Sequence, residues 1–92
     1  MRHRITRQEE STLPKFSNHQ EARQWFKFMY GDDFMLTTVE GDIYFYYLIL
    51  NRKRFDEEMA KLNKGTLGDS SKLLSSYQPV QISADGSVHI VH

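Results

Sequence analysis

The four histidines are the side chains of this 92-residue sequence best suited to bind a metal ion or transfer a proton near neutral pH. They are His3, His19, His89 and His92. The last two form an H-x-x-H motif in a segment with strand character, where a spacing of three directs side chains to opposite faces. His19 stands in the first turn of an expected helix and is most simply a surface residue. Because a metal site needs several convergent ligands, the sequence predicts none.

Carboxylates and serines occur as adjacent pairs, which is a poor arrangement for catalysis. The pairs are Glu9-Glu10, Asp32-Asp33, Glu57-Glu58, Ser70-Ser71 and Ser75-Ser76. Neighbours in sequence point in different directions, so none of these pairs is expected to form a convergent acid–base couple. The five glycines are scattered among turns and caps and form no phosphate-binding loop. We therefore expect a non-enzymatic protein with no catalytic residues and no cofactor.

The bulk composition indicates one small globular domain. Hydrophobic residues make up 39% of the chain and charged residues 26%. Twelve Lys and Arg residues balance twelve Asp and Glu residues, so long-range attraction to nucleic acid is expected to be weak. No apolar run approaches the roughly 18 residues of a membrane helix, and the charged N-terminus does not resemble a secretory signal. The absence of cysteine fits a reducing cytoplasm, which is the expected location.

Two helices are predicted from capping residues and apolar spacing. Ser17 and Asn18 can each cap a helix over residues 18–30, and Asn51 can cap a second helix over residues 52–63. The apolar stripe of the first helix consists of Ala22, Trp25, Phe26 and Met29, and that of the second of Phe55, Met59 and Leu62. A short helical turn is expected after Asp69, in the connection that follows the second helix.

A hairpin is predicted between the two helices, and its second strand is unusual. Residues 43–50 read IYFYYLIL and are apolar at odd and even positions alike, whereas antiparallel strands normally have one polar face. A two-residue turn at positions 40 and 41 places Leu36 opposite Phe45. Phe34 is then opposite Tyr47 in the same register. Directly opposed residues share a face, so these four side chains are expected to gather on one side.

A second hairpin is predicted at the C-terminus around a loop at residues 84–86. With the glycine of this loop in a left-handed conformation, Ile82 pairs with Val88. Val80 then pairs with Ile90, which gives one continuous apolar face. A two-residue turn would divide these side chains between the two faces, so the three-residue loop is preferred.

The resulting order is α-β-β-α-β-β, an α+β fold with a four-stranded antiparallel sheet and two helices on one face. Residues 1–13 contain only Ile5 and Leu13 as aliphatic side chains after Met1, and are expected to form a flexible tail. The remaining residues, 14–92, are expected to form the single domain. Two helix stripes on one face would leave the other face of the sheet without cover.

The uncovered face leads to the functional prediction, which is a homodimer or another protein contact through an exposed aromatic patch. The predicted patch consists of Phe28, Met35, Tyr44, Tyr46, Leu48 and Leu50. The opposing interpretation is that the chain covers this face itself, with the leucines of residues 65–77 or with the N-terminal tail. On the first interpretation the protein is a small binding module, and its size is compatible with a regulatory role.

Single-stranded nucleic-acid binding is the alternative function. Tyr44 and Tyr46 could stack bases, and the cations of Arg52, Lys53 and Arg54 could hold the backbone. Leucines that continue the tyrosine face are better suited to apolar burial than to stacking bases, and the balanced charge also disfavours this alternative. A protein partner is therefore preferred to a nucleic acid, and no membrane contact is expected.

Overall fold

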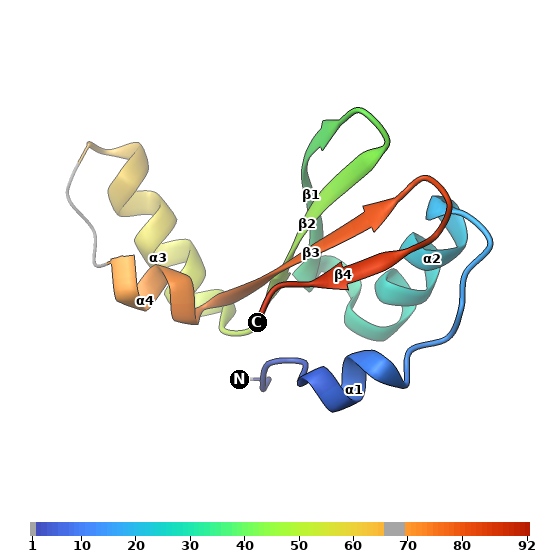
Figure 1. The fold of residues 1–92 in the computed structure, drawn as a ribbon. Helices are drawn as coiled ribbons and strands as arrows, with labels where there is room; N and C mark the ends of the chain where they lie inside the picture. The colour runs from blue at the N-terminus through green and yellow to red at the C-terminus, as the bar shows by residue number, and fades with distance from the viewer. Residues whose placement is uncertain (1, 66–69) are drawn as a thin grey trace.

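A computed structural model describes residues 2–65 and 70–92 of the chain. Within these residues, four strands form one antiparallel sheet in the order β1-β2-β3-β4, with helices on both sides of it (Figure 1). The helices are α1 (Arg7–Ser11), α2 (His19–Tyr30), α3 (Arg52–Asn63) and α4 (Ser70–Ser75), and a 3-10 turn covers Gly31–Asp33. The strands are β1 (Phe34–Glu40), β2 (Ile43–Ile49), β3 (Tyr77–Ser83) and β4 (Val88–Ile90). The predicted α+β class and four-stranded sheet are confirmed.

The two long helices are capped by Asn18, one of the two predicted candidates, and by Asn51, as predicted. The side chain of Asn18 accepts a hydrogen bond from the backbone N–H of Glu21, and Asn51 accepts one from Arg54 in the same way. Each cap satisfies a backbone donor that the first turn would otherwise leave without a partner. The predicted short helical turn corresponds to α4, while Asp69 itself lies outside the described residues.

The C-terminal hairpin has the predicted register. Ile82 pairs with Val88 and Val80 with Ile90. Gly86 has a φ of +91°, and a Cβ atom built on it would lie 2.4 Å from the carbonyl oxygen of Phe16. Glycine is therefore required here both by the backbone conformation and by the close approach of the chain before α2.

The predicted register of the N-terminal hairpin is wrong. The observed pairs are Glu40 with Ile43, Val39 with Tyr44, Thr38 with Phe45, Leu36 with Tyr46, and Phe34 with Leu48. The turn lies one residue later than expected, at Gly41 and Asp42, and a bulge at Thr37 shifts the register again. The Thr37 hydroxyl donates to the Phe45 carbonyl oxygen at 3.0 Å. As a result, Phe34 and Leu36 face the same side as the even-numbered side chains of β2.

That even-numbered side of β2 is the main core, and α2 covers it. The buried cluster contains Ile5, Ala22, Phe26, Phe34, Tyr46, Leu48, Leu50, Val80, Ile82 and Ile90. Three aromatic rings stack through its centre. Phe26 of α2 lies 4.7 Å from Phe34, measured between ring centroids, and Phe34 lies 4.4 Å from Tyr46. This stack fixes α2 over the β1–β2 part of the sheet.

The second long helix, α3, does not join α2 on that face, so the prediction of two helices on one face is wrong. The Phe55 ring packs edge-on against Tyr47 and Tyr77, with centroids 6.2 and 5.9 Å apart. Both tyrosines belong to the opposite face of the sheet, and Figure 1 shows α3 and α4 together at the far end from α2. Because β2 is apolar on both sides, each face of its C-terminal half receives a helix of its own.

The N-terminal residues are folded onto the sheet, so the prediction of a flexible tail is wrong. Thr6 and Glu9 form a reciprocal capping box that begins α1. Ile5 is buried in the main core, and its backbone bonds with the side-chain amide of Gln78 in β3. Burial of one aliphatic side chain together with backbone pairing holds a segment whose composition alone suggested disorder.

Candidate interaction surface

The structure buries most of the residues that were predicted to form an exposed patch. Tyr46, Leu48 and Leu50 belong to the main core beneath α2 and are at most 5% exposed. Their predicted exposure is wrong, because α2 lies on this face of β2. Met35 and Tyr44 are partly buried. Phe28, by contrast, is 88% exposed on the outer side of α2, as expected.

The predicted nucleic-acid site is not brought together. His19 stacks on Tyr44 with ring centroids 3.5 Å apart, and its Nε2 lies 2.6 Å from the Tyr46 hydroxyl. Neither tyrosine therefore offers the open ring face that base stacking requires. Arg52 follows the opposite end of β2, where its guanidinium bonds to the Asp33 carboxylate. The tyrosines and the basic cluster of the predicted site are thus separated, and the tyrosines, Arg52 and Arg54 make contacts within the chain.

His19 is a structural link rather than a simple surface residue. Its backbone N–H donates to the Ala84 carbonyl, and the Ala84 N–H donates to the Asp42 carbonyl. The start of α2 is thereby tied to both hairpin turns. Burial, together with the positive charge of Arg23, lowers the pKa of His19, so the neutral ring is favoured near neutral pH. Desolvation likewise raises the pKa of Tyr46.

Two of the other histidines each lie beside one glutamate. His92 Nε2 lies 2.6 Å from a Glu10 carboxylate oxygen, and His3 lies 3.4 Å from Glu9. The ring of His89 is exposed on β4. Among residues 2–65 and 70–92, no group of three or more potential ligands could hold a metal ion.

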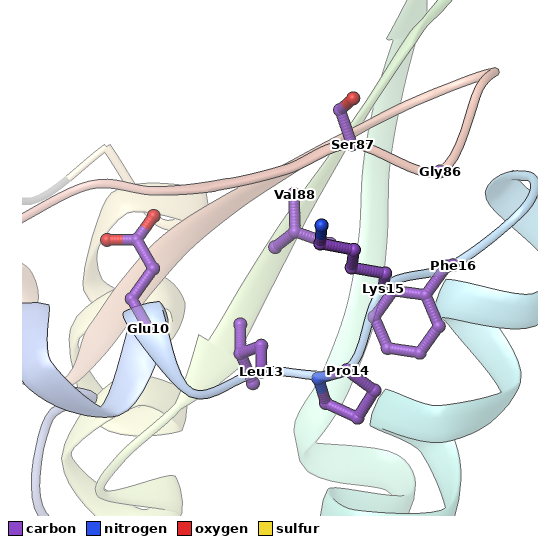
Figure 2. A pocket seen from close by; sticks show the side chains of 8 residues that line it. All are labelled: Glu10, Leu13, Pro14, Lys15, Phe16, Gly86, Ser87 and Val88. Carbon is purple, nitrogen blue, oxygen red and sulfur yellow. The ribbon is translucent and has the colours of Figure 1, made fainter.

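A cavity of about 370 Å³ lies between the α1–α2 connection and the β3–β4 turn (Figure 2). It is lined by Glu10, Leu13, Pro14, Lys15, Phe16, Gly86, Ser87 and Val88. The Glu10 carboxylate is already used, because it accepts a hydrogen bond from the Ile90 backbone N–H at 3.0 Å and contacts His92. Lys15 supplies the other charged group in an otherwise largely apolar lining. Opposite charges on two sides of a mixed cavity do not define a reaction.

The β1–β2 hairpin carries three of the seven large exposed apolar side chains in the described part of the chain. Leu36 is 48% exposed, Val39 46% and Ile43 36%. The other large exposed apolar side chains are Phe28, Met29, Leu62 and Leu74, which are distributed over three helices. Figure 1 shows the end of the hairpin projecting clear of the helices. We call Leu36, Val39, Ile43 and the half-buried Phe45 the hairpin surface.

The hairpin surface has two faces and an open edge. Leu36 and Val39 lie on the α2 side, at the part of β1 that α2 leaves exposed. Ile43 and Phe45 lie on the other side, where Phe45, Thr38 and other residues line a hollow of about 250 Å³. Within the described residues β1 pairs only with β2, so its outer edge carries no strand. The predicted register did not reveal this surface, because it placed Leu36 opposite Phe45, whereas Leu36 pairs with Tyr46 and lies on the α2 side.

Two further observations bear on the class of protein. Among the residues that the structure describes, no helix is both long and apolar enough to cross a bilayer. Comparison with protein-family models, with curated proteins and with solved structures found no match to this chain.

Proposed function

We propose that this protein is a small, non-catalytic binding module that associates with a second copy of itself through the hairpin surface. The proposal rests on three exposed aliphatic side chains that lie on one projecting hairpin, whose outer strand β1 pairs with no strand but β2 among the residues that the structure describes. Apolar patches of this kind commonly mark protein contacts, and two-fold self-association is the most frequent arrangement. A cytoplasmic location and a regulatory role belong to the same proposal.

The two edges of the sheet differ, and the difference supports β1 as the contact. At the β4 edge, the Glu10 carboxylate caps the Ile90 backbone N–H. Edge strands are commonly protected by lysine, proline or a covering segment. The β1 sequence FMLTTVE contains neither lysine nor proline, although the bulge at Thr37 limits regular pairing in its middle. An antiparallel β1–β1 contact would use the free backbone groups and bury Leu36 and Val39.

The required contact area is modest relative to the molecule. Stable interfaces bury about 1,200–2,000 Å² in total, or about 600–1,000 Å² from each copy. This is roughly a tenth to a sixth of the 6101 Å² surface of the chain. One hairpin with its strand edge places the contact at the low end of this range, so we expect a dimer whose population depends on concentration.

Sedimentation equilibrium with a matched pair of variants tests the proposal. The wild type should approach twice its 10.9 kDa mass as concentration rises. Val39→Lys should remain at the monomer mass, because a lysine on an edge strand opposes strand pairing. Leu62→Lys is the control, since Leu62 is 49% exposed on α3 and lies outside the hairpin surface. A monomeric wild type, or equal behaviour of both variants, would reject self-association through this hairpin.

A further inference from the structure

The N-terminal segment, residues 2–11, is held by a set of specific contacts that resemble those of a bound peptide. The Ile5 N–H donates to the Gln78 side-chain oxygen at 2.8 Å, and the Ile5 carbonyl accepts from the Gln78 amide nitrogen at 3.0 Å. The Arg2 N–H donates to the Leu50 carbonyl at 3.0 Å. The Arg2 guanidinium pairs with Asp33 at 2.8 Å and lies over the Tyr30 ring.

Two of the groups that receive this segment, Gln78 and Asp33, are also held by other parts of the chain. The Gln78 amide also donates to the Val91 carbonyl at 3.2 Å, so the side chain keeps a partner without Ile5. The Asp33 carboxylate is held independently by Arg52 at 3.0 Å. The fully buried Gln78 lies on β3 in the middle of the sheet. Because Gln78 lies on a central strand and Asp33 is paired with Arg52, these two groups would keep their positions when the segment leaves.

The segment itself is a self-contained unit. The first turn of its α1 helix is capped by side chains within the segment, through the Thr6–Glu9 capping box, and not by groups of the sheet. At the end of α1, Glu10 bridges the Ile90 N–H and the His92 ring. Residues 12–15 then lead away as a short connection without regular structure. The hydrogen bonds that begin α1 are therefore local to the segment.

We propose that the site formed by Asp33, Leu50, Gln78, Ile90 and His92 is a peptide-binding site, and that its ligand is the N-terminal segment of this chain. The ligand class is a peptide with an arginine and, three positions later, an aliphatic residue in an extended part, followed by a short helix that carries a glutamate five positions after the aliphatic residue. This site lies apart from the hairpin surface and does not depend on the function proposed above.

The covalent connection at residues 12–15 determines which copy's segment occupies the site. A short flexible linker gives an effective concentration on the order of 1 mM, so a chain's own segment outcompetes other copies at micromolar concentration. A segment that is docked for at least nine-tenths of the time then implies a dissociation constant of about 0.1 mM or less for the detached peptide. Binding between molecules becomes visible once the resident segment is disabled.

Fluorescence anisotropy with a labelled synthetic peptide of residues 1–12 tests this site. The receiving protein is the full chain carrying Ile5→Asp, because an ionised side chain is disfavoured at the buried position. We expect saturable binding at about 0.1 mM or below, and at least tenfold weaker apparent binding to the wild-type chain. A peptide carrying Ile5→Asp should not bind. A folded Ile5→Asp chain that shows no binding at about 1 mM would overturn the proposal.

Hydrogen exchange of the wild-type chain provides a test that does not depend on the variant. If the segment detaches from an intact sheet, the Ile5 amide should exchange faster than the protected amides of β2 and β3. Equal opening free energies for all of these amides would show that the segment leaves only on global unfolding, which would overturn the proposal. Should Ile5→Asp lose cooperative unfolding, its recovery on addition of the peptide supports the site, and failure to recover refutes it.

Discussion

Replacing Gln78 by leucine should detach or strain the N-terminal segment while preserving side-chain volume. The fully buried amide of Gln78 provides partners for the Ile5 N–H, the Ile5 carbonyl and the Val91 carbonyl. Leucine offers no polar atom to any of them. In Gln78→Leu the two backbone groups of Ile5 must remain buried without partners or reach water by leaving the sheet.

The magnitude follows from these two groups. A buried polar group without a partner costs about 1–3 kcal/mol, so the Ile5 N–H and carbonyl together cost about 2–6 kcal/mol. The apolar surface of leucine offsets up to about 2 kcal/mol of this. The loss of unfolding free energy in Gln78→Leu cannot exceed the docking free energy of the segment, because the segment would detach before a larger loss was reached. We therefore expect a destabilisation of about 2 kcal/mol.

Urea unfolding at 25 °C measures the effect. With an m-value of about 1–1.5 kcal/mol/M, the midpoint should fall by roughly 1.3–2 M. Gln81→Leu is the matched control, because Gln81 lies on the same strand, faces the opposite side of the sheet and is partly exposed. Its unfolding free energy should stay within about 0.5 kcal/mol of the wild type. A Gln78→Leu midpoint equal to that of the control would refute the account of how the segment is held.

Two further predictions concern the turns and the link at the start of α2. Gly86→Ala should destabilise the fold by about 3 kcal/mol in the same assay, because its Cβ would meet the Phe16 carbonyl and its φ is positive. Gly41→Ala, with positive φ but open space, should lose only about 1 kcal/mol, and equal losses would contradict the role of the contact. Because burial and Arg23 lower the pKa of His19, the unfolded chain binds this proton more tightly. Stability should therefore decline as pH falls from about 6.5 through the folded pKa, and His19→Gln should remove this part of a pH series of unfolding measurements.

Local signals predicted the helices and the C-terminal hairpin. The caps at Asn18 and Asn51 act within one turn of the chain, so they can be recognised from short sequence windows. The loop at residues 84–86 likewise has one register that keeps Val80 and Ile82 on a common apolar face. These elements follow from contacts between residues close in sequence.

Which side chains and helices lie on each face of the sheet depends on features that local sequence patterns do not indicate. The bulge at Thr37 alters the register, although no glycine or proline in β1 indicates a bulge there. The pairing of Ile5 with Gln78 spans 73 positions, so local composition could not predict that the N-terminus is folded. The apolar character of both faces of β2 was recognised, but α2 and α3 cover different faces. The predicted interface therefore fell on the core, and the exposed surface on β1 was missed.

The carboxylate of Glu10 on the backbone of β4 limits how many molecules could assemble through strand pairing. With the β4 edge of the sheet capped, each copy has only the β1 edge available for pairing with another copy. Two copies joined through β1 then have no further edge to offer. Growth would then stop at a pair. A chain that had lost this cap would present two edge strands able to pair, β1 and β4. Strand pairing between copies could then continue from molecule to molecule and form a fibre.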